Sequence, residues 1–312
     1  MRVFFRLFRL LLFVPPPLVS FAAVVLGRFF YYCLPIRRGI VRVQMENTLG
    51  KELSPREVRR LVRRNYEHYA FLFVESLLLA SLDFSRTRYF HEHVEMEGLE
   101  EMKAALAQGK GVIGVCAHLG CWEMLGPCCA TRIAPVTVVV KYLRNPLVQA
   151  LREEMQRHEG IRLVDVRAGR ERMRALLSAL RRGEVTGLFV DQYRHGAERV
   201  PFFGYPVRTN PVAAVLAERT GAPVILAYVV RRRFGRYVMV MERLEPPALP
   251  EDTPKEERIL RLTAFFNGKI EEAIRAHPEQ WLWAHTRFRH LPWYDAALPP
   301  RSRRSRRRGK EA

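Results

Sequence analysis

The stretch GVIGVCAHLGCWEML, residues 111–125, carries the clearest fold signal in this chain. Residues 111–117 form a short, uninterrupted apolar run, which predicts a strand buried on both faces. His118 follows directly, and Glu123 falls where a helix is expected to begin, within CWEMLGPCCA. We therefore expect His118 at the carboxyl end of a central strand, where open α/β sheets bind their ligands.

The rest of the chain alternates strands with helices. Apolar runs predict strands at 136–141, 161–166 and 185–192, and residues 222–244 are typical of a hairpin that turns near Phe234 and Gly235. Helical spacing predicts helices over 53–82, 99–110, 146–160, 169–184 and 255–278. Ser54 and Glu57 form a capping-box pattern, and Thr209 is the expected cap of a further helix. We predict an α/β fold with a mostly parallel central sheet and helices on both faces.

The chain is strongly basic, with 52 Lys and Arg against 32 Asp and Glu and a net charge of +20. The positive electrostatic potential of such a chain favours an anionic partner: nucleic acid, an anionic membrane or a phosphorylated substrate. The tail RSRRSRRRGKEA contributes part of the excess, and we expect residues 297–312 to be a disordered basic tail. The sequence holds no helix-turn-helix, zinc-finger or aromatic RNA motif, so we expect no nucleic-acid partner.

The five cysteines fit neither a disulfide framework nor a zinc site, because their number is odd and their spacing is irregular. An HExxH metal motif is also absent from the sequence. We therefore expect a reducing compartment, no metal site and no cofactor.

Residues 1–36 are apolar and dotted with arginines. Between Arg9 and Arg28 lie 18 residues without charge, the lower limit for a membrane-spanning helix, and Pro15, Pro16 and Pro17 interrupt them. We predict a membrane-anchor helix that either spans the bilayer or lies in its interface. A cleaved signal peptide is the rival interpretation, and the odd cysteine count argues against it.

His118 and Glu123 are five residues apart, which places them about 140° apart on one ideal helix. They meet only if His118 precedes the helix and Gly120 lets the backbone turn back. Glu123 would then accept a hydrogen bond from one imidazole nitrogen, while the other takes a proton from a substrate hydroxyl. By spacing alone, a purely structural pair is the alternative.

The block AHLGCWE resembles the motif of the bacterial lipid A late acyltransferases, the Kdo-dependent lauroyl/myristoyl acyltransferase family. This family lies within the lysophospholipid acyltransferases, which share a His-x4-Asp/Glu signature. Further blocks match in the same order: RVQMENTLG (42–50), KYLRNP (141–146), LFVDQ (188–192), VPFFGYPVRT (200–209) and EQWLWAHTRFR (279–289). Cys121 departs from the family, which more often has Asn there. The resemblance implies a membrane anchor followed by an acyltransferase domain at 37–296.

The resemblance implies transfer of a fatty acyl group from a thioester, of acyl carrier protein or coenzyme A, to a hydroxyl of a phosphorylated glycolipid, a lipid A precursor. It implies an anionic inner membrane as the location, with the catalytic domain facing the cytoplasm. His118 is then the general base and Glu123 its orienter. Arg144 is our candidate to stabilise the oxyanion, and Asp191 is expected either to orient a basic group or the acceptor, or to cap its loop.

A second group of residues is expected to bind substrate. Gly204 and Thr209, with Arg208 beside them, are candidates for a phosphate site, with a simple turn and helix cap as the alternative. Arg287 is expected to contact phosphate or the membrane surface, or else to pack against Trp281 and Trp283. The basic helix at 169–184 either docks an acidic carrier protein or is a solvated face. Gly120 and Asn145 complete the predicted set.

Two other functions remain open from the sequence. The same chemistry could serve another acceptor, such as a lysophospholipid or a mannosylated glycolipid. Outside enzymes, the charge and the apolar start are also typical of a basic protein that binds a membrane surface.

Overall fold

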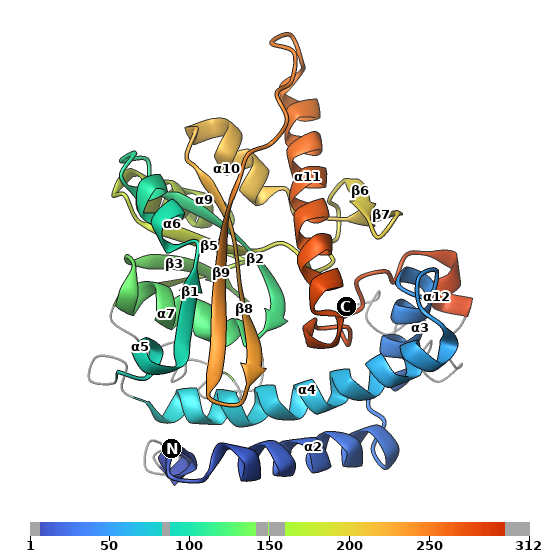
Figure 1. Cartoon of the computed structure of the whole chain (residues 1–312). Coiled ribbons are helices and arrows are strands. Elements are labelled where there is room, and N and C mark those ends of the chain that lie inside the picture. The colour runs from blue at the N-terminus through green and yellow to red at the C-terminus, as the bar shows by residue number, and fades with distance from the viewer. Residues whose placement is uncertain (1–6, 83–87, 142–148, 150–159, 297–312) are drawn as a thin grey trace.

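The computed structural model of the protein describes residues 7–82, 88–141, 149 and 160–296. The central sheet has the strand order β1-β9-β8-β2-β5-β3-β4 (Figure 1). Its strands are β1 (Val94–Glu97), β2 (Val112–Gly120), β3 (Val136–Val140), β4 (Ile161–Asp165), β5 (Val185–Phe189), β8 (Val224–Arg233) and β9 (Arg236–Leu244). All neighbours in this order pair in parallel except β8 and β9. The predicted mostly parallel sheet is thus confirmed, as is the hairpin between β8 and β9.

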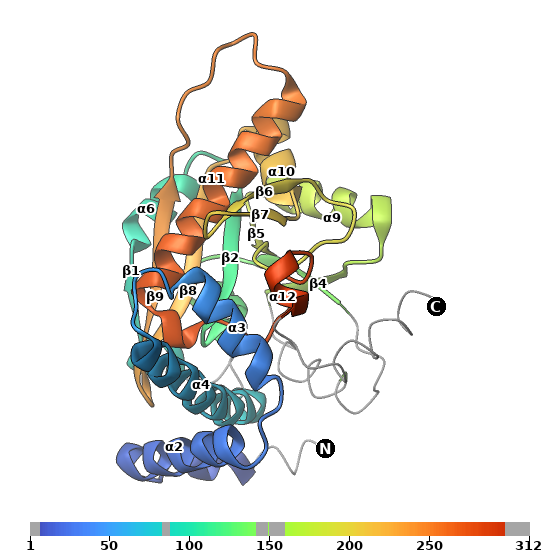
Figure 2. The ribbon, with the colours of Figure 1, turned by 90° about the vertical axis from the view of Figure 1, so that its right-hand side faces the viewer.

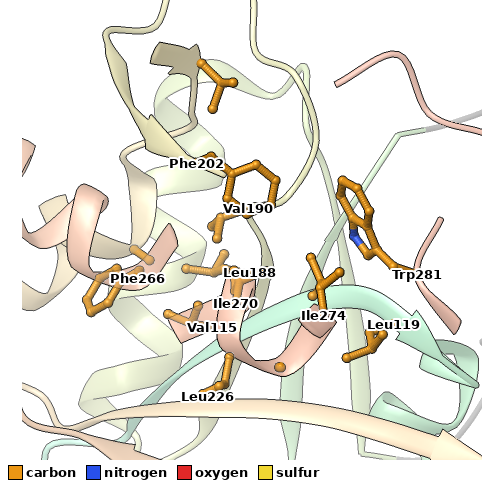
Figure 3. Close-up of a cluster of buried hydrophobic side chains, with 14 of the residues drawn as sticks. Val115, Leu119, Leu188, Val190, Phe202, Leu226, Phe266, Ile270, Ile274 and Trp281 are labelled. Carbon is orange, nitrogen blue, oxygen red and sulfur yellow. The ribbon is translucent and has the colours of Figure 1, made fainter. Parts of the chain in front are cut away.

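Helices cover both faces of the sheet, as predicted. One face packs against α9 (Gly169–Arg181), α10 (Val212–Thr220) and α11 (Lys255–Ala276). Figure 3 shows Val115, Leu188 and Leu226 of the sheet meeting Phe266, Ile270 and Ile274 of α11 in this core. The other face packs against α6 (Leu99–Leu106) and α7 (Leu125–Arg132). Short elements flank these layers: α5 (Tyr89–His93), η2 (Trp122–Met124), the hairpin β6 (Arg199–Phe202) and β7 (Tyr205–Arg208), η3 (Pro278–Gln280) and α12 (Pro292–Ala296).

A long helix, α4 (Pro55–Ser81), crosses the edge of the sheet where β2 and β8 end, with α3 (Arg38–Thr48) at one end of it (Figures 1 and 2). The predicted capping box starts α4, because Ser54 Oγ accepts from the Glu57 amide and the Glu57 carboxylate accepts from the Ser54 amide. A buried ion pair ties α4 to the end of β8, where Arg231 Nη2 donates to Glu75 Oε2 at 2.7 Å. The carboxyl edge of the sheet is therefore fixed against α4.

The N-terminal segment forms two helices. The 3-10 helix η1 (Phe8–Leu12) ends before the prolines, and α2 (Pro16–Tyr32) begins with two of them, Pro16 and Pro17, in its first turn. Proline suits this position because its fixed φ matches the helix and its missing N–H would have had no intrahelical acceptor. Helix α2 packs along the outer side of α4 (Figure 1). Within the described residues, no helix has both the length and the apolar character needed to cross a membrane.

Strand β2 runs further than the sequence predicts, to Gly120, so His118 lies within the strand and not in a loop. Gly120 has a φ of +62°, and a Cβ there would lie 1.8 Å from the Val229 carbonyl oxygen. Only glycine fits this close approach. The segment after Trp281 extends the pairing, since the Leu282 amide donates to the His118 carbonyl at 3.0 Å. Backbone contacts on both sides thus hold the end of β2.

Candidate active site

The structure places His118 against Asp191. Strand β5 pairs with β2, and Asp191 lies two residues after the end of β5 at Phe189. His118 Nδ1 lies 2.8 Å from Asp191 Oδ1, and the His118 backbone amide donates to Asp191 Oδ2 at 2.8 Å. The indole of Trp281 donates to the same Oδ2, also at 2.8 Å. One buried carboxylate therefore fixes the imidazole, the strand that carries it and the C-terminal segment.

The protonation state of this pair follows from its hydrogen bonds. Burial alone would raise the pKa of Asp191, but the charge and hydrogen bonds of His118, with the Trp281 bond, hold that pKa at about 2. An ionised carboxylate only accepts, so the proton of a neutral imidazole is on Nδ1. His118 Nε2 is then left as the proton acceptor, with the side-chain nitrogen of Gln192 3.2 Å away. This is the geometry of a general base with its orienting carboxylate.

The predicted hydrogen bond between Glu123 and His118 is wrong. After the turn at Gly120 the chain enters η2, and Glu123 Oε1 accepts from the indole of its neighbour Trp122 at 3.2 Å. The Trp122 ring packs edge-to-face on His118, with the ring centroids 5.4 Å apart. Glu123 still lines the same cavity as His118. The chain turns more tightly than an N-terminal helical turn would, so Glu123 reaches the cavity but not the imidazole.

His118 opens onto a cavity of about 1100 Å³ that lies against the α6 and α7 face of the sheet. Its deeper lining is apolar and rich in small residues: Gly114, Cys116, Gly126, Gly187, Ala227, Val136, Val138, Ile225, Met102 and Met241. Its polar lining includes Lys141, Arg167, Arg172, Arg194, His195 and Arg289. The site therefore joins an apolar chamber and a cationic region at one imidazole.

The predicted phosphate site near the β6–β7 hairpin is not built as expected. Gly204 turns the hairpin with a φ of +73°, and Arg208 donates to the Ala197 carbonyl. The Thr209 amide donates to the Glu198 carbonyl, so it is not free for a ligand. The prediction that Thr209 caps a helix is also wrong, because Pro211 holds the N-cap position of α10 and the Asn210 side chain accepts from the Val212 amide. Arg144 and Asn145 lie outside the described residues.

Arg287 is fully buried, so it contacts neither solvent nor a membrane surface. It donates to the carbonyls of Gln192 and Arg208, both at 2.8 Å, and to Thr209 Oγ1 at 2.7 Å. Burial lowers its pKa to about 10, although Asp191 acts in the opposite direction. Its guanidinium lies over the ring of Phe202, 5.1 Å from the ring centroid, and not over the predicted partners Trp281 and Trp283. Its role is to hold the segment after Asp191 in place.

Three residues around the dyad escaped the sequence reasoning: Trp281, Gln192 and His285. Trp281 and His285 belong to the block EQWLWAHTRFR and Gln192 to LFVDQ, so the resemblance contained them without giving them roles. His285 lines the cavity, and its Nε2 accepts from the Tyr193 amide at 3.1 Å. Burial lowers the pKa of His285 to about 4. Among the described residues, no three His, Cys, Asp or Glu side chains are grouped to hold a metal ion.

Comparisons with known proteins identify the family of the chain. The family model described as bacterial lipid A biosynthesis acyltransferase matches residues 3–290. The chain belongs to this family and is an O-acyltransferase.

Among its relatives, a lipid A biosynthesis palmitoleoyltransferase of Escherichia coli (strain K12) is 28% identical over 289 residues, 91% of this chain and 89% of the relative. A lipid A biosynthesis lauroyltransferase of the same strain is 24% identical over 284 residues, 89% of this chain and 88% of the relative. A phosphatidylinositol mannoside acyltransferase of Mycobacterium tuberculosis (strain CDC 1551 / Oshkosh) is 28% identical over 187 residues, 59% of this chain and 56% of the relative.

The half-buried His285, whose pKa is lowered, predicts a pH-dependent stability. Its folded pKa of about 4 lies below the ordinary value of 6.5, so between these values the unfolded chain binds a proton that the folded chain does not. The free energy of unfolding should therefore fall as the pH drops from about 6.5 to about 4, with at most about 3 kcal/mol from this residue. His285→Gln keeps an acceptor for the Tyr193 amide and should lose that contribution in urea denaturation at several pH values. The exposed His91→Gln is the control, and an unchanged pH slope in His285→Gln would contradict the assignment.

Proposed function

We propose that this protein is a membrane-associated enzyme that transfers a fatty acyl group from an acyl thioester, of acyl carrier protein or coenzyme A, to a hydroxyl of a lipid A precursor. The observation that carries the proposal is the His118–Asp191 pair: His118 lines the cavity, and its Nε2 has the Gln192 side-chain nitrogen 3.2 Å away. Family membership supports the reaction class, and the names of the two Escherichia coli relatives support lipid A as the acceptor. A mannosylated glycolipid, as in the name of the mycobacterial relative, is the alternative acceptor.

In the proposed reaction, His118 Nε2 takes the proton of the acceptor hydroxyl as its oxygen attacks the thioester carbonyl carbon. The resulting imidazolium is stabilised by Asp191, which stays ionised because of its low pKa. The tetrahedral intermediate then collapses, the carbon–sulfur bond breaks, and the leaving thiolate takes the proton from His118. The products are an ester and a free thiol, and the base is regenerated.

Two further residues keep proposed roles. Glu123 lines the cavity near His118, and we assign it to the acceptor, whose hydroxyl groups its carboxylate would orient. Arg144 remains our candidate for stabilising the negative charge on the carbonyl oxygen. Asp191 replaces Glu123 as the residue that orients the imidazole.

We place the fatty acyl chain in the apolar part of the cavity. Gly114 of β2 and Gly187 of β5 are register partners, and both line it. A Cβ on Gly187 would meet Val138 Cγ2 at 3.6 Å and Val136 Cγ2 at 3.9 Å, which are ordinary contacts. A larger side chain at 187 is thus tolerated by the strand but occupies space in the cavity.

The apolar side of α2 supports membrane association. Its inner side packs on α4 so closely that a Cβ on Gly27 would lie 2.4 Å from Glu67 Cα. This contact leaves a row of large apolar side chains exposed on α2: Leu18, Phe21, Val25, Phe29 and Tyr32. A fixed helix with one exposed apolar side is suited to lying in a membrane interface. Because α4 lies at the edge of the sheet where β2 ends, such binding would bring His118 toward the lipid substrate (Figure 1). The bounds 1–36 and 37–296 remain our proposal for anchor and catalytic domain, with the domain in the cytoplasm at the inner membrane.

The catalytic assignment predicts distinct losses at the dyad. His118→Ala and Asp191→Asn should each lower kcat by about 10²–10⁴-fold, because the first removes the base and the second removes the charge that holds its tautomer. Acylated product formed from a lipid A precursor and an acyl thioester is measured by mass spectrometry, which also identifies the acceptor and chain. The exposed His91→Ala is the control, and circular dichroism checks that each variant folds. A His118→Ala enzyme with the normal rate would refute the mechanism.

The placement of the acyl chain predicts a change in chain preference. Gly187→Val should shift the preferred donor to a shorter chain, since each methylene excluded from the cavity loses about 0.8 kcal/mol of burial. Competition between acyl donors of different length, read as product ratios, measures the shift. Thr186→Val is the matched control, because Thr186 is on the same strand but faces the opposite side of the sheet. Identical product ratios for Gly187→Val and the parent would place the chain elsewhere.

The membrane assignment predicts weaker binding when charge is added to the apolar side of α2. The double variant Phe21→Glu, Phe29→Glu should bind vesicles containing phosphatidylglycerol at least about 100-fold more weakly. The reason is that two phenyl rings that would enter the lipid are replaced by carboxylates. Vesicle co-sedimentation measures this partition. Leu260→Glu, on the half-exposed surface of α11, is the control. Equal binding by the double variant and the control would show that α2 does not touch lipid.

A further inference from the structure

The polar side of the cavity is cationic. Five of its described lining residues are Lys or Arg: Lys141, Arg167, Arg172, Arg194 and Arg289. Glu123 is the acidic residue among the described lining residues, and its carboxylate accepts from Trp122. Positive charge is thus concentrated at the entrance to the site beyond what the acidic residues there balance. Such a concentration favours an anionic ligand.

Arg172 and Arg194 both line the cavity, and the charge of Arg194 acts on Arg172. Arg172, in the first turn of α9, donates through Nη1 to the Val166 carbonyl, while its buried Nε has no hydrogen-bond partner in the described structure. Burial and the nearby charge of Arg194 lower the pKa of Arg172. A buried donor without an acceptor and a pair of like charges both cost free energy, and an anion between them would relieve both.

Many arginines elsewhere in the protein have acidic partners. Arg182 pairs with Glu184, Arg258 with Glu218, and Arg275 with both Glu52 and Glu271. Within the described residues, the side chains of Arg172 and Arg194 form no ion pair.

The segment that follows Asp191 links this cationic group to the catalytic dyad. Gln192 lies against His118, the Tyr193 amide donates to His285, and Arg194 follows. The Arg289 guanidinium stacks on the Tyr193 ring, 3.7 Å from its centroid. A ligand held by Arg194 and Arg289 is thereby positioned relative to His118.

We propose that Arg172, Arg194 and Arg289 form a binding site for a phosphate ester group of a substrate, at the entrance to the cavity. The inference rests on the proposed function, in which both substrates carry phosphate. The acceptor glycolipid is phosphorylated, and the thioesters of coenzyme A and of acyl carrier protein carry a phosphodiester in the pantetheine arm. Guanidinium groups suit either ester, because their parallel N–H donors match two phosphate oxygens.

The test compares Arg172→Gln, Arg194→Gln and Arg289→Gln with Arg219→Gln, an exposed arginine of α10 outside the cavity. Each enzyme is assayed with the phosphorylated and the dephosphorylated acceptor, and with acyl coenzyme A and the phosphate-free acyl N-acetylcysteamine. We expect the KM for one phosphate-bearing substrate to rise at least about tenfold in the three variants, with little change in kcat. The KM for its phosphate-free counterpart should not change.

If the KM rises for the phosphorylated acceptor but not for the dephosphorylated one, the bound phosphate belongs to the acceptor. If it rises for acyl coenzyme A but not for acyl N-acetylcysteamine, the bound phosphate belongs to the donor. KM values equal to those of Arg219→Gln for every substrate would overturn the proposal, and so would equal losses with and without phosphate.

A second measurement separates this proposal from the proposed function. If the parent enzyme transfers no acyl group in any pairing, the proposed function fails, and binding of inorganic pyrophosphate by calorimetry then decides on the site alone. Binding that weakens at least about tenfold in Arg194→Gln but not in Arg219→Gln supports the site. No binding by the parent enzyme, or equal binding by both variants, rejects it.

Discussion

The Asp191 carboxylate is the contact on which the architecture of the site depends. Its two oxygens accept from the imidazole and the backbone amide of His118 and from the indole of Trp281. These donors come from β2 and from the segment after α11, while Asp191 itself follows β5. A buried carboxylate persists in the ionised form only when such donors surround it, and here they hold its pKa at about 2. The same three hydrogen bonds that stabilise the charge therefore also determine where the base points.

The surroundings of this carboxylate are built to limit movement. Arg287 is buried beside it and donates to the Gln192 carbonyl, so the chain just after Asp191 has a second anchor. Trp281 stacks among the aromatic side chains of Phe202, Phe203 and Trp283. On the other side, Gly120 brings the β2 backbone against Val229, closer than any side chain allows. Catalytic geometry needs such rigid support because a base must be within hydrogen-bond distance of the proton it accepts.

Three chemical environments meet at His118. Small residues of the sheet leave room for an apolar chain, guanidinium groups surround the entrance, and the exposed apolar side of α2 lies beyond α4 at the same edge. The reaction that we propose, between a long acyl chain and a phosphorylated membrane lipid, would use all three. Part of the positive charge of the chain, which by itself identifies no partner, lies in the lining of this cavity.

By itself, the sequence determined the layers of the fold and the position of the base. Apolar runs of strand length and helical periodicity are local signals, so the parallel sheet, the β8–β9 turn and the Ser54 capping box were all predictable. The position of His118 near the end of a strand could be predicted for the same reason. The family resemblance could also be recognised, because its motifs are short contiguous stretches of sequence.

Only the tertiary structure decided which carboxylate lies against the His118 imidazole. Glu123 is five residues from His118 and Asp191 is 73, yet strand pairing places the latter against the imidazole. Burial of Arg287 and the free donor of Arg172 likewise depend on residues distant in the chain. Sequence spacing describes contacts within one element, whereas hydrogen bonds between elements follow from how a sheet brings separate strand ends together at one edge.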